Sequence, residues 1–330
     1  MSTLDVQSLT EEIKERSQFV DAILDEASKV IVGQKVLLER LLLAILCEGH
    51  VLLEGLPGLA KTLTIKTLAD VIHTEFQRIQ FTPDLLPADL VGTMIFNQKT
   101  GEFTPRKGPI FTSLVLADEI NRAPAKVQSA LLEAMGEHQV TIGETTYPMN
   151  ELFTVLATQN PIEQEGTYPL PEAQLDRFLF KVRIGYPTLI EEKGILNRMS
   201  GAVVPKANRI CHPTTIIEAR KICSRIYMDE KLKDYILSIV FATRTPEKFG
   251  LPELKPQIQV GASPRATLAL AKASRANAFI HHRGFVTPED VKSIAYDVLR
   301  HRVLVSFEAE ADGVDSDQVI KKILERVEVP

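Results

Sequence analysis

The chain has 330 residues, 45% of them hydrophobic and 25% charged, so it belongs with globular proteins and is long enough for two domains. A formal net charge of −5 excludes a global basic field that would recruit nucleic acid or an anionic membrane. Its three cysteines lack C-x-x-C spacing, and no apolar run approaches the length of a membrane span. We therefore expect a cytoplasmic protein without a disulfide framework or membrane insertion.

The N-terminal stretch is predicted to be helical. Apolar residues recur at helical spacing from Val6 to Ser28, and the pattern stops at Gly33. A second helix is expected over Lys35 to Glu48, and it leads into an apolar strand, Val51 to Glu54.

The segment after this strand resembles a phosphate-binding loop. The general pattern is G-x-x-x-x-G-K-[ST], and the chain has Gly55, Lys61 and Thr62 in register but Ala60 in place of the second glycine. We expect the loop backbone to surround phosphates, Lys61 to reach the outer phosphates and Thr62 to hold Mg²⁺. The residues assigned to nucleotide binding are Gly55, Pro57, Gly58, Leu59, Ala60, Lys61, Thr62 and Leu63. The alternative is an ordinary strand-to-helix turn with a surface lysine.

Strands and helices alternate from residue 51 to residue 187, which predicts a parallel sheet covered on both faces. The expected strands after the loop are 76–82, 113–119, 153–158 and 178–184, and the expected helices are 62–72 and 124–137. Two hairpins interrupt this alternation, 93–97 with 102–105, and 139–142 with 145–149.

Beyond Pro187 the pattern becomes helical and predicts a smaller all-α domain. Its expected helices are 189–200, 214–226, 231–244, 264–278, 288–301 and 316–327, with a loop over 247–261.

Polar side chains stand at the ends of the predicted parallel strands. Asp118 and Glu119 follow one strand and Asn160 follows another, so both should meet the loop at Gly55 along one edge of the sheet. Asp118 would hold Mg²⁺, Glu119 would orient the attacking water, and Asn160 would contact that water or the γ-phosphate. Alternatively, Asp118 and Glu119 would only cap the following helix.

Several motifs in fixed order resemble the MoxR family of AAA+ ATPases. They are the phosphate loop, Leu114-Val-Leu-Ala-Asp-Glu-Ile-Asn-Arg-Ala-Pro124, Ala157-Thr-Gln-Asn-Pro161, Leu170-Pro-Glu-Ala-Gln-Leu-Asp-Arg-Phe178 and Gly261-Ala-Ser-Pro-Arg-Ala266. The family also shows alanine before the loop lysine. The resemblance implies an α/β P-loop AAA+ parallel-sheet core with two inserted β-hairpins and an all-α lid. On this basis we expect an N-terminal helix over 1–29, the nucleotide-binding core over 30–187 and the helical lid over 188–330.

The resemblance also implies roles for individual residues. Arg177 matches the arginine finger that enters a neighbouring subunit's site, and Arg265 matches the second sensor on the lid, with Ser263 and Pro264 as helix cap and first helical residue. Val32, Gly33 and Gln34 match the segment that packs on adenine. The role of Arg122 stays open between an interface or sensing arginine and a structural salt bridge. An arginine finger requires a ring, which the family resemblance implies to be a hexamer using ATP and Mg²⁺.

Three kinds of work are compatible with such a ring. The resemblance implies a chaperone-like ATPase that matures partner protein complexes with a von Willebrand factor A domain protein, in some cases inserting a metal or cofactor. A magnesium-chelatase-type motor subunit and a DNA translocase are the alternatives. The segment from Gly136 to Met149 contains no Lys or Arg, which disfavours contact between this hairpin and nucleic-acid phosphates.

Overall fold

The structure is a computed structural model that describes residues 3–56, 58–99, 101–160, 166–200 and 205–330. The chain divides into two compact units. The sheet unit comprises residues 22–178 and 182–217, and the helical unit comprises residues 1–21, 179–181 and 218–330. The three-part division predicted from the sequence stays a prediction.

A five-stranded sheet, in the order β2-β5-β8-β1-β9, organises the sheet unit. Neighbours among β2, β5, β8 and β1 pair in parallel. The strands are β1 (Val51–Gly55), β2 (Phe76–Gln80), β5 (Leu114–Asp118), β8 (Thr154–Gln159) and β9 (Phe180–Ile184). The central strand β5 is an apolar run with four buried residues, as expected for a parallel strand covered on both faces.

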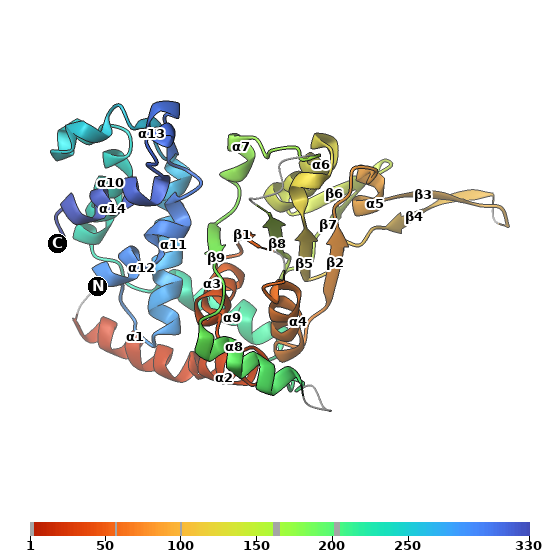
Figure 1. The fold of residues 1–330 in the computed structure, drawn as a ribbon. Helices are drawn as coiled ribbons and strands as arrows, with labels where there is room; N and C mark the ends of the chain where they lie inside the picture. Colours follow the sequence, from red (N-terminus) through yellow and green to blue (C-terminus); the bar gives the residue numbers. More distant parts are fainter. Residues whose placement is uncertain (1–2, 57, 100, 161–165, 201–204) are drawn as a thin grey trace. The chain divides into compact units, whose positions relative to one another are not determined.

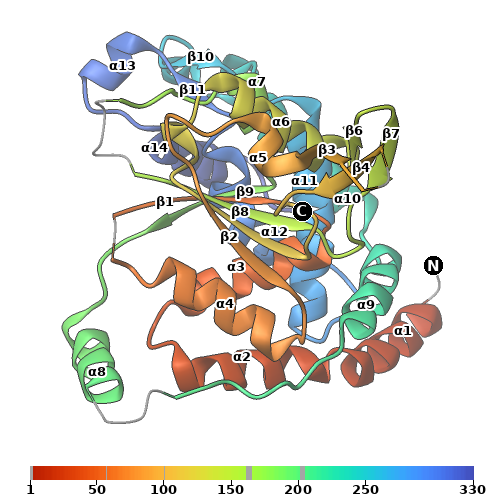
Figure 2. The same ribbon diagram turned by 90° about the vertical axis from the view of Figure 1, so that its right-hand side faces the viewer.

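Helices cover both faces of this sheet, with α3 and α4 on one side and α5 and α6 on the other (Figure 2). The helices of this part of the chain are α2 (Gln18–Val30), α3 (Lys35–Leu46), α4 (Lys61–Val71), α5 (Pro87–Val91), α6 (Ala125–Glu137), α7 (Glu172–Leu175) and α8 (Leu189–Met199), with the 3-10 turn η1 (Ile120–Arg122) after β5. The fully buried phenylalanines Phe81, Phe153 and Phe178 belong to the core under α6. The predicted α/β layers are therefore present.

Both predicted hairpins form. They are β3 (Gly92–Asn97) with β4 (Glu102–Lys107), and β6 (Gln139–Ile142) with β7 (Thr145–Pro148), each antiparallel. The β3–β4 hairpin extends away from the sheet (Figure 1). Its exposed Phe96 and Phe103 face each other across the strands, with ring centroids 5.1 Å apart.

A buried histidine ties α6 to the sheet. Nδ1 of His50 accepts a hydrogen bond from the Val155 backbone amide at 3.0 Å, and its other ring nitrogen lies 3.2 Å from the Met135 carbonyl. Because Nδ1 accepts, Nε2 must carry the proton of the neutral ring and donates it to Met135. Burial lowers the pKa of His50 to about 3, which keeps the ring neutral at physiological pH.

The helical unit is built from helices with one short sheet. Its elements are α1 (Thr3–Arg16), α9 (Pro213–Arg225), α10 (Glu230–Ala242), α11 (Pro264–Ile280), α12 (Pro288–Leu299), α13 (Phe307–Ala311) and α14 (Ser316–Arg326), the 3-10 turns η2 (Pro246–Phe249) and η3 (Pro252–Leu254), and the antiparallel strands β10 (Ile258–Val260) and β11 (Leu304–Val305). The segment 247–261, expected to be a loop, thus contains two short turns and a strand. Asp290, which is 1% exposed, accepts hydrogen bonds from Asn277 and Arg283 and so joins α11 to α12.

The single helix predicted over Val6 to Ser28 is wrong, because the chain breaks at Ser17 into α1 and α2. The Ser17 hydroxyl donates to the Ile13 carbonyl at 2.6 Å and lies 2.5 Å from Nδ1 of His282, whose Nε2 approaches Asp21 at 2.8 Å. A serine that bonds its own helix favours a bend. Although this order of groups resembles a catalytic triad, Ser17 is 0% exposed and cannot reach a substrate.

None of the helices in the described residues combines the length and the apolar character that a membrane span requires.

Candidate active site

The loop between β1 and α4 has the backbone of an anion cradle. Gly58 has a φ of 81°, and Ala60 is left-handed with a φ of 55° and a ψ of 21°. Ala60 immediately precedes α4, and no side chain caps this helix. The first amides of a helix have no partners within it, so those of α4 are available to a bound anion.

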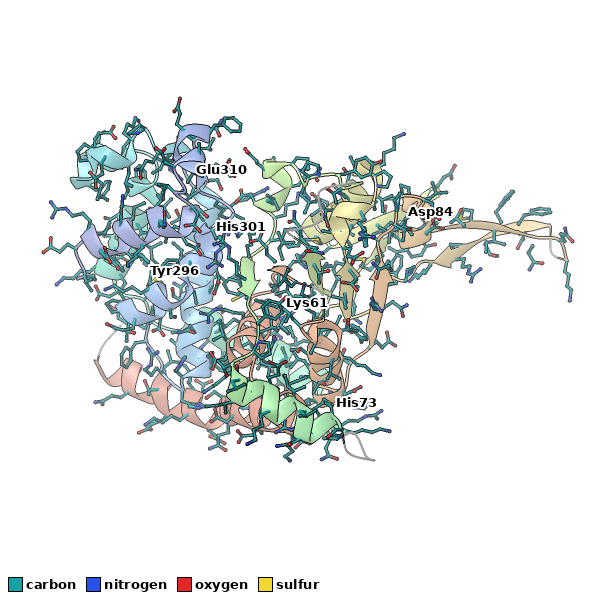
Figure 3. All side chains as sticks on the ribbon, viewed as in Figure 1. Lys61, His73, Asp84, Tyr296, His301 and Glu310 are labelled. Atoms are coloured by element: carbon teal, nitrogen blue, oxygen red, sulfur yellow. The ribbon has the colours of Figure 1, made fainter. Side chains whose placement is uncertain are left out.

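Lys61, labelled in Figure 3, is the first residue of α4. Its Nζ donates a hydrogen bond to the Gly55 carbonyl, which bends the side chain back along the loop. Burial lowers the pKa of Lys61 below its ordinary value, and the carboxylates of Asp118 and Glu119 oppose that shift. The charge of Lys61 therefore interacts with the charges of Asp118 and Glu119.

A cavity of about 450 Å³ lies beside the loop. It brings together the loop and the ends of three parallel strands, β1, β5 and β8, as the sequence predicts. The lining residues are Gly55, Gly58, Leu59, Ala60, Lys61, Thr62, Leu63, Arg78, Asp118, Glu119, Thr158 and Asn160. Pro57, also predicted to bind nucleotide, lies outside the described residues.

Asp118, at the end of β5, is held by two neighbouring strands. Its Oδ2 accepts from Nε and Nη2 of Arg78 on β2, at 3.0 and 2.6 Å. Its Oδ1 accepts from the Thr158 hydroxyl on β8 at 2.7 Å. The carboxylate is therefore oriented from both sides and paired with the Arg78 guanidinium.

Glu119 follows directly and has a left-handed backbone, with a φ of 57°. Its Oε2 accepts from Gln80 at 2.9 Å and lies 3.1 Å from Nε of Arg122. An ion pair is thus present for Arg122, one of the two possibilities left open by the sequence. Fully buried Gln128 donates to the Ile120 and Ala123 carbonyls, which fixes the turn after Glu119.

A second, mostly apolar cavity of about 270 Å³ shares Gly58, Leu59, Ala60 and Leu63 with the first. Val32 and Gln34 line it, together with the start of α8, whereas Gly33 stands beside it with a φ of 67°. A Cβ at Gly33 would meet the Glu191 carboxylate at 2.5 Å, so this backbone position favours glycine. The pair of cavities suits a flat apolar group joined to an anion.

Arg177 does not line either of these two cavities. Its Nη1 donates to the Leu132 carbonyl in α6 at 2.8 Å. Arg265 belongs to the helical unit, where the predicted cap is confirmed: Ser263 accepts from the Arg265 amide at 3.2 Å, and α11 begins at Pro264. Within the sheet unit, therefore, Arg177 is held at α6 and not at the cavities.

Comparison with known proteins assigns the family. Residues 50–180 match the family described as ATPase family associated with various cellular activities (AAA), and residues 253–323 match the AAA lid domain. The chain is 49% identical over 305 residues to Chaperone MoxR1 of Mycobacterium tuberculosis, covering 92% of this chain and 81% of that protein. The chain belongs to the MoxR family of AAA ATPases.

Other relatives agree with the MoxR assignment. Protein MoxR of Paracoccus denitrificans is 30% identical, with 84% of this chain and 86% of that protein covered. The uncharacterized protein YeaC of Bacillus subtilis is 43% identical, with 93% of each covered. A crystal structure of a putative ATPase from Cytophaga hutchinsonii superposes with a TM-score of 0.91 at 47% identity, covering 99% of this chain and 98% of that one.

Membership of the MoxR family makes the chain a nucleotide-binding ATPase with the AAA+ fold, as the sequence motifs predict. It also indicates assembly into oligomeric rings.

Sequence reasoning missed several residues of the candidate site. Arg78 and Gln80 lie on β2, and Thr158 precedes the recognised Gln159-Asn160-Pro161 segment. The available signal was the alternation of Arg78 and Gln80 along a strand, which places both on one face. Only the strand order shows that this face borders Asp118.

Proposed function

We propose that this MoxR-family chain hydrolyses ATP at a site shared between neighbouring subunits of a ring and uses the energy to remodel partner protein complexes. One observation carries the proposal: the phosphate loop, both acids and Asn160 line a single cavity, while Arg177 is bonded to α6 outside it. The site thus has the groups for binding and for activating water, and an arginine from a neighbouring subunit would complete it.

The residues present fit Mg²⁺. Thr62 and Asp118 line the same cavity and supply hydroxyl and carboxylate oxygens, the ligand type that Mg²⁺ takes together with phosphates and water. When bound, the ion would neutralise charge that develops on the phosphates. ATP and Mg²⁺ are accordingly the proposed cofactors, with Thr62 and Asp118 as the protein's metal ligands.

Some of the other residues around this cavity would bind the phosphates, and others would take part in hydrolysis. The amides at the start of α4 and the Lys61 ammonium would hold the β- and γ-phosphates. The Glu119 carboxylate would accept a hydrogen bond from the attacking water and aim it at the γ-phosphate, and Asn160 would hold the water or the γ-phosphate from the β8 side. The apolar cavity would take the adenine ring against Val32, Gly33 and Gln34.

Two arginines would act on the phosphates from further away. Arg177 would enter the site of the next subunit and stabilise charge on the transferred phosphoryl group. Arg265, at the start of the lid helix α11, would act as a second sensor of the phosphates. We retain the proposed division into an N-terminal helix over 1–29, a core over 30–187 and a lid over 188–330.

The hairpins favour a protein client over a nucleic acid. Phe96 and Phe103 of the β3–β4 hairpin are 51% and 64% exposed, which gives the projecting arm an apolar pair. Lys107 in the same hairpin lies 4.9 and 4.8 Å from the ring centroids of Phe111 and Tyr147, so part of its charge is engaged within the chain. The relative named Chaperone MoxR1 is consistent with client remodelling. A hexameric ring working with a von Willebrand factor A domain protein, and in some cases inserting a metal or cofactor, completes the proposal.

The test is the ATPase rate of the purified ring alone and with candidate stimulators. A von Willebrand factor A domain protein encoded beside this chain should raise the ATPase rate. The same protein should co-purify with the Glu119→Gln ring in ATP, because a ring that cannot hydrolyse ATP should keep its partner bound. Single-stranded and duplex DNA should leave the rate unchanged. Strong stimulation by DNA alone would contradict the proposed client class and favour a translocase.

A further inference from the structure

The edge strand β2 presents two polar side chains to the acids of the site. Arg78 pairs with Leu116 and Gln80 pairs with Asp118 in the parallel register of β2 and β5. Residues two apart on a strand share a face, so Arg78 and Gln80 lie side by side. Arg78 is also one of the residues that line the phosphate cavity.

Arg78 covers one oxygen of the carboxylate that is proposed to bind metal. Nε and Nη2 both reach Asp118 Oδ2, at 3.0 and 2.6 Å. A carboxylate oxygen has two lone pairs, and both of these are therefore used by one guanidinium. The Thr158 hydroxyl donates to one lone pair of Oδ1 at 2.7 Å. Of the Asp118 carboxylate, only the second lone pair of Oδ1 has no hydrogen-bond partner among the described residues.

We propose that Arg78 is a built-in competitor of the metal ion: its guanidinium neutralises Asp118 and gives up Oδ2 of that carboxylate when Mg²⁺ binds. This inference rests on the proposed ATP–Mg²⁺ function of the cavity. The exchange is feasible because the Arg78 side chain is 50% exposed and the Asp118 side chain 18% exposed. Ion pairs this accessible to water are weak, so the guanidinium can move into solvent at small cost.

The same guanidinium also reaches the neighbour of the second acid. Nη2 of Arg78 donates to Gln80 Oε1 at 3.0 Å, and Gln80 Nε2 donates to Glu119 Oε2 at 2.9 Å. Departure of Arg78 therefore removes one of the contacts that orient Gln80 against Glu119. Metal occupancy at Asp118 and the restraint on Glu119 are coupled through β2.

The test measures metal binding without turnover. Mn²⁺ binding is followed by electron paramagnetic resonance in saturating ADP, for the parent ring and for Arg78→Gln. Arg78→Gln should bind Mn²⁺ about three- to tenfold more tightly, because a competing cation is gone. Arg78→Lys keeps the positive charge but loses the planar set of guanidinium donors. Its Mn²⁺ affinity should lie between those of the parent and Arg78→Gln.

A matched control removes an equivalent ion pair elsewhere. Arg225 forms two 2.9 Å hydrogen bonds with Glu12 in the helical unit, and their side chains are 56% and 37% exposed. Arg225→Gln should therefore bind Mn²⁺ as the parent does. ADP affinity in EDTA should be the same for all four proteins, and their circular dichroism should report equal folding.

The outcomes separate the inference from the function on which it rests. A parent ring that does not bind ADP, or whose ADP affinity ignores Mn²⁺, would overturn the proposed function and the inference together. If Mn²⁺ strengthens ADP binding in the parent but Arg78→Gln shows equal or weaker Mn²⁺ affinity, the inference alone is overturned. Weaker ADP binding by Arg78→Gln in EDTA would instead make Arg78 a phosphate contact, and would also overturn the inference.

Discussion

Three residues of the candidate site hold a left-handed backbone without being glycine. They are Gln34, Ala60 and Glu119, with φ of 56°, 55° and 57°. This conformation costs about 1–2 kcal/mol for a residue with a Cβ, so the surrounding contacts must impose it. At Glu119 they include the hydrogen bond from its own amide to the Thr158 hydroxyl. The strain marks positions where the direction of a side chain or an amide matters.

Ala60→Gly tests this strain at the loop position where the general motif has glycine. Its methyl group is exposed, so no buried packing is lost. Removing the left-handed penalty should offset the greater flexibility of glycine in the unfolded chain. We expect a melting temperature equal to or slightly above that of the parent, and ATP affinity within about threefold.

The comparison variant for Ala60→Gly is Ala60→Val, which adds a β-branched side chain at the same left-handed position and should weaken ATP binding strongly. A loss of ATP affinity in Ala60→Gly similar to that in Ala60→Val would show that the methyl itself contributes to binding. The loop geometry would then not explain the alanine.

The C-terminal half of helix α6 holds the side chain of Arg177, the proposed arginine finger, which follows α7 in the chain. The Arg177 guanidinium donates to the Leu132 carbonyl and passes over Gly136 so closely that a Cβ there would collide with Nη1. Gly136 is exposed and lies in the last turn of the helix, where glycine is less favourable than alanine by up to about 1 kcal/mol. The glycine therefore leaves room for Arg177 at the expense of helix stability.

Gly136→Ala should lower the ATPase activity of the ring without lowering the stability of the chain. Alanine should raise or maintain the melting temperature through helix propensity, while its methyl group moves the guanidinium and lowers the ATPase rate of the ring. ATP affinity should stay at the parent value, because Gly136 does not line the described cavities. The control is Glu133→Ala on the same helix, which is also exposed. Unchanged ATPase activity in Gly136→Ala would show that the contact of the Arg177 side chain with α6 is unimportant.

Elements with local signals were predictable from the sequence. The strand before Gly55 and the helix after it follow from an apolar run, turn residues and helical spacing, and Ser263 marks the start of α11. The break between α1 and α2 was not predictable, because it depends on contact between Ser17 and His282, far apart in sequence. The pairing of β10 with β11 is equally non-local.

At the scale of the whole molecule, the same distinction applies to the site. Lys61, Asp118 and Glu119 could be found because motif spacing and strand ends identify them. Arg78 could not, since its contact with Asp118 exists only through the pairing of β2 with β5, forty residues later in the chain. The proposed completion of the site by Arg177 would depend on a neighbouring subunit, and a single chain shows only the contact of this arginine with α6.

A site shared between neighbouring subunits can be tested by mixing two inactive variants. Arg177→Ala keeps its own acids but offers no arginine to its neighbour, whereas Glu119→Gln lacks the acid but still offers Arg177. Each variant alone should bind ATP but hydrolyse it slowly. Loss of the arginine finger should lower the hydrolysis rate by a factor of about 10³ relative to the parent.

In rings mixed at equal amounts, about a quarter of the sites should pair an intact Glu119 with a neighbour's Arg177, by random assortment around a head-to-tail ring. The measurement is the ATPase rate of such rings, with mixing verified by a tag on one variant. We expect recovery to about a quarter of the parent rate. No recovery in verified mixed rings, or parent-like activity of Arg177→Ala alone, would contradict it.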